Sequence, residues 1–174
     1  MTLFNSTKDA RPSVRSLARA GLIAAIYVLL TLIFQPISFG AIQFRIAEAL
    51  MLLPVMVADA VPGLFIGCLL ANLLGGGVWF DVVLGSLATL LAAVVVRKWR
   101  NKPVAAAASP VLFNGLIVGP VVYFAYVHAP GTPVSVGTIF FNIATVALGE
   151  LVVCYVLGLP MLYALKKLPA RIFD

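Results

Sequence analysis

The hydrophobic residues of this chain form long runs that polar residues rarely interrupt, and short polar segments separate the runs. Four runs are clear, over residues 17–34, 80–96, 104–127 and 136–165. A helix needs about 20 apolar residues to cross the hydrocarbon core of a bilayer, and each run is close to that length or longer. The pattern therefore predicts four membrane-spanning helices.

A further apolar stretch, residues 46–74, is less regular because Pro54, Asp59, Pro62 and Gly63 break it. Proline and glycine interrupt helices, so the stretch is either one kinked span or two short spans that meet near Asp59. Hydropathy alone leaves both possibilities open.

The positions of lysine and arginine distinguish the two possibilities. These residues gather before the first apolar run, at residues 97–102 and at residues 166–171. Basic loops remain on the cytoplasmic side of a membrane, and the three clusters share one side only if the stretch crosses twice, as 46–58 and 62–74. We therefore expect an all-α polytopic membrane protein with six transmembrane helices in one bundle, both termini cytoplasmic, and a single transmembrane domain over residues 1–174.

The composition supports this class and argues against others. Of the 174 residues 63% are hydrophobic and 10% are charged, with a mean hydropathy of +1.11, whereas soluble domains carry about 25% charged residues. The net charge of +6 reflects the basic clusters and does not indicate nucleic-acid binding. Cys68 and Cys154 lie inside apolar runs, where we interpret them as small packing residues. No catalytic or metal-binding motif is present, so we expect neither an enzyme nor a metal site.

A small set of polar residues nevertheless falls at membrane depth. Ionisable groups there cost at least about 2.5 kcal/mol each, so they usually face the bundle interior, pair with one another or bind a ligand. In the six-helix topology nearly all of them lie toward the outer side, and the carboxylates exceed the one arginine by two. We therefore predict an outward-facing pocket for a cationic or donor-rich ligand. The residues are Arg45, Glu48, Asn72, Asp81, Asn114, Asn142 and Glu150.

Each of these residues also has a purely structural interpretation. Arg45 and Glu48 are three residues apart and could form an ion pair within one helix. Asp81 could cap the N-terminus of its helix, and the asparagines could join neighbouring helices by hydrogen bonds. Glu150 has no cation near it in the sequence, so a structural role explains it least well.

The first apolar run carries small residues at helical spacing, with Ala20 and Ala24, then Gly21 and Ala25, four positions apart. Small residues so spaced let another helix approach closely. That helix could belong to the same bundle or to a partner protein.

Four segments of the chain resemble a known family. They are PISFGAIQFRIAEALMLLP (36–54), GCLLANLLGGG (67–77), FDVVLGSLATLLAA (80–93) and GELVVCYVLGLP (149–160). Together they are similar to the QueT family, the queuosine-precursor S-components, or substrate-binding subunits, of energy-coupling factor (ECF) transporters, and the similarity extends over about residues 18–165.

The resemblance implies an S-component fold in a prokaryotic plasma membrane and the uptake of a 7-substituted 7-deazaguanine, such as 7-aminomethyl-7-deazaguanine. It implies no cofactor in this chain, because two partner ATPase subunits hydrolyse the ATP. A transmembrane coupling subunit would dock on the first helix, at Ala20, Gly21, Ala24 and Ala25. The guanine edge of such a base presents N–H donors that a carboxylate can accept, and its aminomethyl cation could pair with a second carboxylate. The candidate substrate-binding residues are Gln43, Arg45, Glu48, Asn72, Asp81, Asn114 and Glu150.

Other functions stay open at this point. An independent secondary transporter would need a polar path to the inner side, where the sequence offers little beyond Asp59. An S-component of different specificity would keep the fold and change the ligand. A membrane scaffold would need no pocket. The sequence also leaves open whether the ligand is the aminomethyl base, its cyano precursor or queuine.

Overall fold

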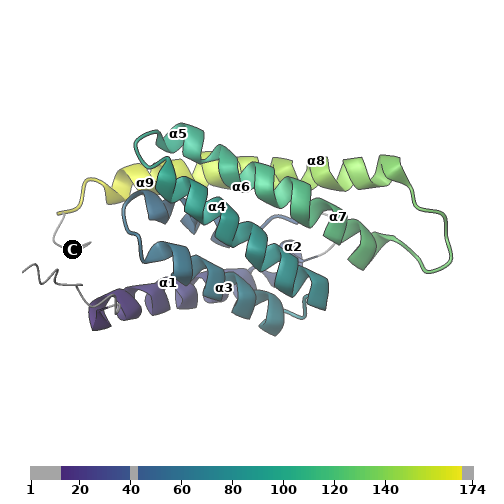
Figure 1. Cartoon of the computed structure of the whole chain (residues 1–174), viewed down its shortest axis with the longest axis horizontal. Helices are drawn as coiled ribbons and strands as arrows, with labels where there is room; N and C mark the ends of the chain where they lie inside the picture. The colour runs from purple at the N-terminus through teal and green to yellow at the C-terminus, as the bar shows by residue number, and fades with distance from the viewer. Residues whose placement is uncertain (1–12, 40–42, 170–174) are drawn as a thin grey trace, which may run out of the picture.

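The structure, a computed structural model, describes residues 13–39 and 43–169. Within these ranges all regular secondary structure is helical. The chain runs back and forth along the long axis of the molecule (Figure 1). The label η1 denotes a 3-10 helix, and η2 to η5 denote π-helical segments. In chain order the elements are α1 (Val14–Ile33), α2 (Gln35–Ser38), η1 (Ile46–Val55), α3 (Ala60–Leu74), η2 (Asp81–Gly85), α4 (Ser86–Lys98), α5 (Pro103–Ala106), α6 (Ala108–Phe113), η3 (Asn114–Val118), α7 (Gly119–Val122), η4 (Tyr123–Val127), α8 (Val136–Val152), η5 (Val153–Gly158) and α9 (Leu159–Leu165).

Within the described ranges, three helices are long and apolar enough to cross a membrane: Val14–Ile33, Pro103–Val127 and Val136–Leu165. They correspond to the predicted runs 17–34, 104–127 and 136–165. The predicted run 80–96 corresponds to η2 and α4, which follow one another without a break. The prediction of an all-helical membrane protein is confirmed.

The irregular stretch 46–74 forms two segments, η1 and α3. The structure differs from the expected helix over 46–58, because η1 is a 3-10 helix of ten residues that extends only about 20 Å at about 2 Å per residue. Pro54 lies inside it, and proline has no N–H to donate to an α-helical ladder. Nearly all of η1 is buried, so it forms the centre of the bundle.

Helices α1 and α3 pack tightly because glycines of α3 face small residues of α1. A Cβ atom added at Gly63 would lie 2.7 Å from the Ala20 carbonyl oxygen, and one at Gly67 would lie 2.8 Å from the Tyr27 Cβ atom. Ala24 is buried against this seam. The spacing of Ala20 and Ala24 therefore serves packing within the bundle.

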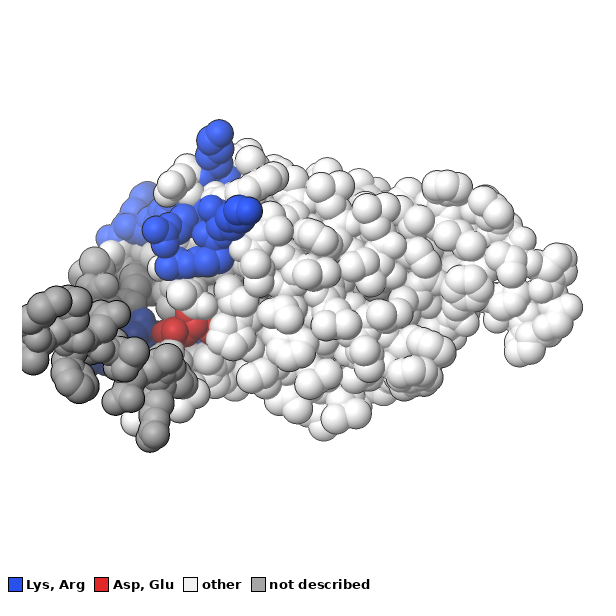
Figure 2. Space-filling model, in the orientation of Figure 1, with Lys and Arg blue, Asp and Glu red and all other residues white. Residues whose placement is uncertain are grey.

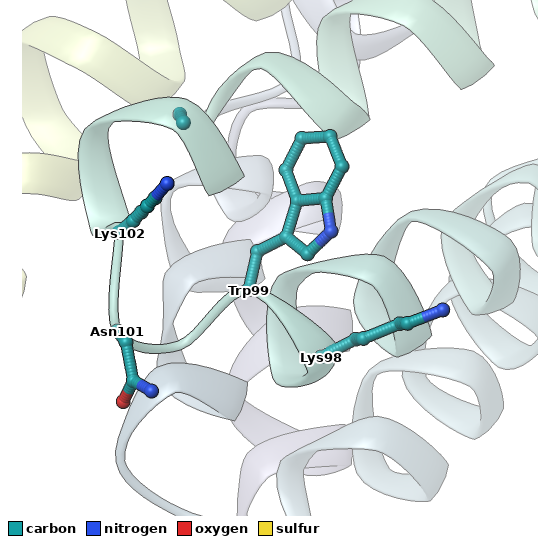
Figure 3. A pocket seen from close by; sticks show the side chains of 5 residues that line it. Lys98, Trp99, Asn101 and Lys102 are labelled. Atoms are coloured by element: carbon teal, nitrogen blue, oxygen red, sulfur yellow. The ribbon is translucent and has the colours of Figure 1, made fainter.

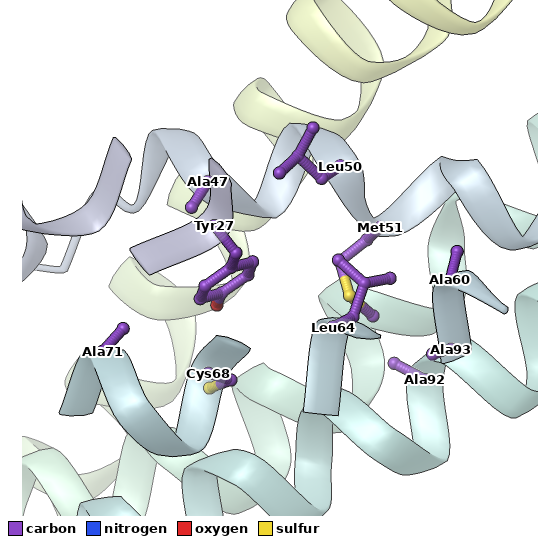
Figure 4. Packing of buried hydrophobic residues seen from close by; sticks show 10 residues of the cluster. All are labelled: Tyr27, Ala47, Leu50, Met51, Ala60, Leu64, Cys68, Ala71, Ala92 and Ala93. Carbon is purple, nitrogen blue, oxygen red and sulfur yellow. The ribbon is translucent and has the colours of Figure 1, made fainter. Parts of the chain in front are cut away.

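The interior of the bundle is built from small side chains, and the large ones mostly face outward. Alanines such as Ala47, Ala60 and Ala92 are fully buried around Met51 and Leu64 (Figure 4). Large apolar residues cover the outside instead, for example Leu22, Leu73, Leu116, Phe140 and Leu148. An exterior of this kind is stable only in contact with lipid or another apolar surface.

The charged residues on the visible surface gather at one end of the molecule, where α4 ends and where the two ends of the described chain also lie (Figures 1 and 2). Arg97 and Lys98 form the last turn of α4 there. Asp59 belongs to the same end, because its carboxylate pairs with Arg19 at 3.3 Å and accepts a 2.6 Å bond from Ser16. The opposite end lacks such a cluster on the face shown.

Candidate functional site

The seven residues predicted to bind substrate are all buried. They come from six parts of the fold: the segment before η1 supplies Gln43 and Arg45, and η1, α3, η2, η3 and α8 supply one residue each. Asn72 lies in the last turn of α3, and Asp81 begins η2. These positions lie at the ends of their helices remote from the basic clusters. The one-sided distribution of polar residues that the sequence indicated is thus present in the structure.

Arg45 joins three of the elements. Its Nη2 atom lies 3.7 Å from Asp81 Oδ2 and donates to Gln43 Oε1 at 3.3 Å. Its Nη1 atom donates to Cys68 Sγ at 3.6 Å, and its guanidinium lies 5.3 Å from the centre of the Phe39 ring. Arg45 therefore lies at the centre of a polar cluster and cannot reach lipid.

The ion pair between Arg45 and Glu48 that their spacing suggested is not formed. Arg45 has extended backbone angles, φ −102° and ψ 99°, and precedes η1 as its N-cap residue. The three-residue spacing brings two side chains together only when both residues are inside one helix. The carboxylate partner of Arg45 is Asp81, which is distant in the sequence.

Asp81 does not cap a helix. The residue at the N-cap of η2 is Phe80, and no side chain caps this segment. Among the described residues, no hydrogen-bond donor reaches either carboxylate oxygen of Asp81. Gly85 lies against the carboxylate, since a Cβ atom there would be 2.8 Å from Asp81 Oδ1. The absence of a side chain at Gly85 thus makes room for a carboxylate whose ion-pair partner is Arg45.

Asn72 supports this part of the cluster from α3. Its side-chain nitrogen donates to the Asp81 backbone carbonyl at 3.1 Å and to Cys68 Sγ at 3.6 Å. Thr89 also donates to Cys68 Sγ, at 3.3 Å. The sulfur of Cys68, which the sequence indicated only as a packing residue, thus accepts bonds from three polar side chains. No described residue donates to the Asn72 side-chain oxygen.

Glu48 is held by a residue that the sequence analysis missed. The hydroxyl of Tyr27, a fully buried residue of α1, donates to Glu48 Oε1. The second oxygen, Oε2, is buried, and the part of the chain that the structure describes supplies no donor to it. A tyrosine within an apolar run carries no local signal of this role.

Glu150 and Asn114 form the other part of the cluster. Asn114 Nδ2 donates to Glu150 Oε1 at 2.8 Å, and the Asn114 oxygen is left without a donor. Cys154 Sγ lies 3.9 Å from Glu150 Oε2 and 3.8 Å from the Glu48 carbonyl oxygen, so it lies between the two glutamates. Asn142 instead donates to the Thr138 carbonyl of its own helix, at 2.9 Å.

The covering segment, which comprises Phe39 and residues 43–45, packs closely against two glycines. A Cβ atom at Gly75 would overlap the Phe39 ring, and one at Gly149 would lie 2.6 Å from the Gln43 carbonyl oxygen. Gln43 also lines a groove of about 310 Å³ along α8. The covering segment therefore lies between α3 and α8, next to an opening.

The atoms left without partners define what the cluster can bind. Among the described residues, five buried oxygens of the seven site residues have no donor, and two of their nitrogens, Gln43 Nε2 and Arg45 Nε, have no acceptor. Buried polar atoms are almost always hydrogen-bonded, so a ligand can complete such a set. The cluster contains three carboxyl groups and one guanidinium, and the carboxyl group that pairs with the guanidinium is that of Asp81. The oxygens are those of Glu48 (Oε2), Asn72 (Oδ1), Asp81 (Oδ1 and Oδ2) and Asn114 (Oδ1).

Fold and site together define a class: a helical membrane protein that encloses an acceptor-rich polar site. In the described part of the chain, no group of three or more His, Cys, Asp or Glu residues is placed to hold a metal ion.

Comparison with known proteins identifies the family. The model of the QueT transporter family matches residues 17–167, so the chain belongs to the QueT transporter family. The chain is also similar to a protein of Lactococcus lactis subsp. cremoris described as queuosine precursor transporter QueT, with 38% identity over 72 residues. That match covers 40% of this chain and 42% of the relative, less than half of either. No solved structure matches the chain.

Family membership confirms the resemblance that the four segments carried. Together with the long apolar helices, it makes the chain a multi-pass membrane protein of this family.

Proposed function

We propose that this protein is the substrate-binding S-component of an ECF-type importer and captures a queuosine precursor from outside the cell. The substrate class is a 7-substituted 7-deazaguanine, with 7-aminomethyl-7-deazaguanine the best fit. The observation that carries the proposal is the buried set of three carboxyl groups and one guanidinium, in which five oxygens have no donor among the described residues.

The groups of the cluster can match the groups of this base. On the 7-deazaguanine ring, the carbonyl oxygen lies between the 7-substituent and the N–H donors of the guanine edge. Arg45 pairs with Asp81, and Glu48 and Glu150 are the other buried carboxylates of the cluster. Asp81 would therefore bind the aminomethyl cation, Arg45 the carbonyl oxygen, and Glu48 with Glu150 the N–H donors.

The amide side chains complete the assignment. Gln43 Nε2 has no acceptor among the described residues and would share the ligand carbonyl with Arg45. The oxygens of Asn72 and Asn114 have no donors in the same part of the chain and would accept the remaining N–H groups. Phe39 stacks over Arg45 at 5.3 Å and would close the site above the ligand.

Uptake would depend on partner subunits, a transmembrane coupling subunit and two ATPases that hydrolyse ATP. A groove of about 480 Å³ between α1 and α3 supports docking at the first helix, with Gly21, Ala24 and Ala25 in its lining. Ala24 is buried at this groove, while Gly21 and Ala25 are exposed. The basic end would face the cytoplasm of a prokaryotic cell, with both termini on that side.

Calorimetric titration of the purified protein tests the substrate assignment. The ligands are 7-aminomethyl-7-deazaguanine, its 7-cyano counterpart and queuine, with guanine as the control that lacks a 7-substituent. We expect the aminomethyl base to bind most tightly, because it alone of the three 7-deazaguanines brings a primary ammonium group to Asp81. Failure of all three bases to bind would overturn the substrate class.

Uptake measured in cells with and without the coupling and ATPase subunits tests the transport mode. We expect uptake only when all subunits are present. Uptake by this chain alone would show an independent secondary transporter instead.

A further inference from the structure

A second pocket lies far from the polar cluster, at the end of the molecule where the basic residues gather. It has a volume of about 460 Å³ and opens between the last turn of α4 and the start of α5 (Figure 3). Its lining consists of Lys98, Trp99, Asn101, Lys102 and Ala105. None of these residues takes part in the substrate site.

A tight turn creates the pocket. The N–H of Trp99 ends α4 by donating to the Val95 carbonyl, and the N–H of Lys102 donates to the Trp99 carbonyl at 2.8 Å. Pro103 then starts α5 with the fixed backbone angle that suits a first helical position. The turn brings the indole of Trp99 and the ammonium group of Lys102 to the same side of the chain (Figure 3).

The two lysines of the pocket have no acidic partner among residues 13–39 and 43–169. Nearby cations are used within the fold, since Arg97 Nη1 donates to the Pro54 carbonyl at 3.1 Å and Arg19 pairs with Asp59. Within the described part of the chain, Lys98 and Lys102 form no ion pair. Their charges are therefore available to an external anion.

The surroundings of the pocket indicate which anion. Trp99 is half exposed, and an indole in such a position is typical of the boundary between hydrocarbon and headgroups. Exposed apolar side chains continue from the pocket along the helices, with Val94 and Leu91 on α4 and Leu112 on α6. A ligand with a phosphate at one end and acyl chains at the other matches both surfaces.

We propose that this pocket binds the phosphate headgroup of an anionic phospholipid, with Lys98 and Lys102 as the cationic contacts and Trp99 at the level of the ester groups. The acyl chains lie along the exposed faces of α4 and α6. The site fixes the depth of the α4–α5 turn at the membrane surface, and it is independent of which solute the protein carries.

Native mass spectrometry of the purified full-length protein tests the proposal. The protein is titrated with phosphatidylglycerol, with zwitterionic phosphatidylcholine, and with inorganic phosphate as a competitor. The pocket variant combines Lys98→Gln with Lys102→Gln. The control variant combines Lys166→Gln with Lys167→Gln, which removes the same charge at the same end of the molecule but outside the pocket. Both pairs are exposed, so thermal unfolding without added lipid should be unchanged in both variants.

We expect phosphatidylglycerol to bind the parent in preference to phosphatidylcholine. The pocket variant should lose about 10-fold to 30-fold in affinity, whereas the control variant should lose less than about 3-fold. Equal losses of affinity in the two variants would show that the lipid is bound by diffuse surface charge, which would contradict the proposed site. Competition by inorganic phosphate at lipid-like concentrations would show a free-anion site. Full lipid binding by the pocket variant, with loss of assembly with the partner subunits, would make the pocket a protein interface.

Discussion

Glu48 offers the sharpest test of the substrate site, because its two oxygens have different surroundings. Oε1 accepts a bond from Tyr27, and Oε2 has no donor within the protein. In the variant Glu48→Gln the amide oxygen can keep the bond from Tyr27, but the amide nitrogen then takes the place of Oε2. A ligand N–H would meet a donor instead of a charged acceptor.

The expected loss follows from this replacement. A hydrogen bond to a charged group contributes about 1.5 to 3 kcal/mol, and a ligand donor left unpaired adds to the cost. We therefore expect the affinity for 7-aminomethyl-7-deazaguanine to fall about 30-fold to 150-fold, which corresponds to about 2 to 3 kcal/mol. The melting temperature of the ligand-free protein should not fall, because the bond to Tyr27 is kept.

The variant Tyr27→Phe is the matched comparison, since it removes the donor and leaves the carboxylate. Glu48 Oε1 then becomes a buried acceptor without a partner, which costs about 1 to 3 kcal/mol of stability. A decrease of several degrees in melting temperature is expected for a chain of this size. Calorimetry and thermal unfolding are measured side by side for both variants. Unchanged affinity together with a lower melting temperature in Glu48→Gln would refute the reasoning, because it would make Glu48 a structural residue.

Three further predictions concern docking, topology and the covering segment. Ala25→Trp fills the groove between α1 and α3 and should abolish uptake without changing ligand affinity. The control Leu22→Trp lies outside that groove and should leave uptake intact, and uptake by Ala25→Trp would exclude the groove as the docking surface. Arg100→Cys should react with an impermeant thiol reagent only after cell lysis, whereas Thr132→Cys, in the loop between η4 and α8, should react in intact cells. The reverse labelling pattern would show that the topology is inverted. Gly149→Ala places a Cβ atom 2.6 Å from the Gln43 carbonyl oxygen in the covering segment and should weaken ligand binding about 10-fold in calorimetry. Unchanged affinity would show that the covering segment does not contact the ligand.

The sequence alone was sufficient for the class of protein and for most of the helices. The apolar runs 17–34, 104–127 and 136–165 coincide with long helices, because the ability to cross a bilayer depends on local length and composition. The sequence did not predict η1 as a 3-10 helix; Pro54 and the burial of most of the segment favour this form. The stretch 46–74 contains two helical segments, η1 and α3, and the prediction that each of them spans the membrane stays a prediction.

The candidate site divides in the same way. Charged and amide groups are costly in hydrocarbon, so the sequence itself determined that Arg45, Glu48 and Glu150 must be sheltered, and all are buried. Which groups become partners depends on distances between helices that are far apart in the sequence. Only the tertiary structure could pair Arg45 with Asp81 and could place the hydroxyl of Tyr27 on Glu48. Local spacing suggested a different pair because it presumes that neighbouring residues share one helix, and the extended backbone before η1 removes that condition.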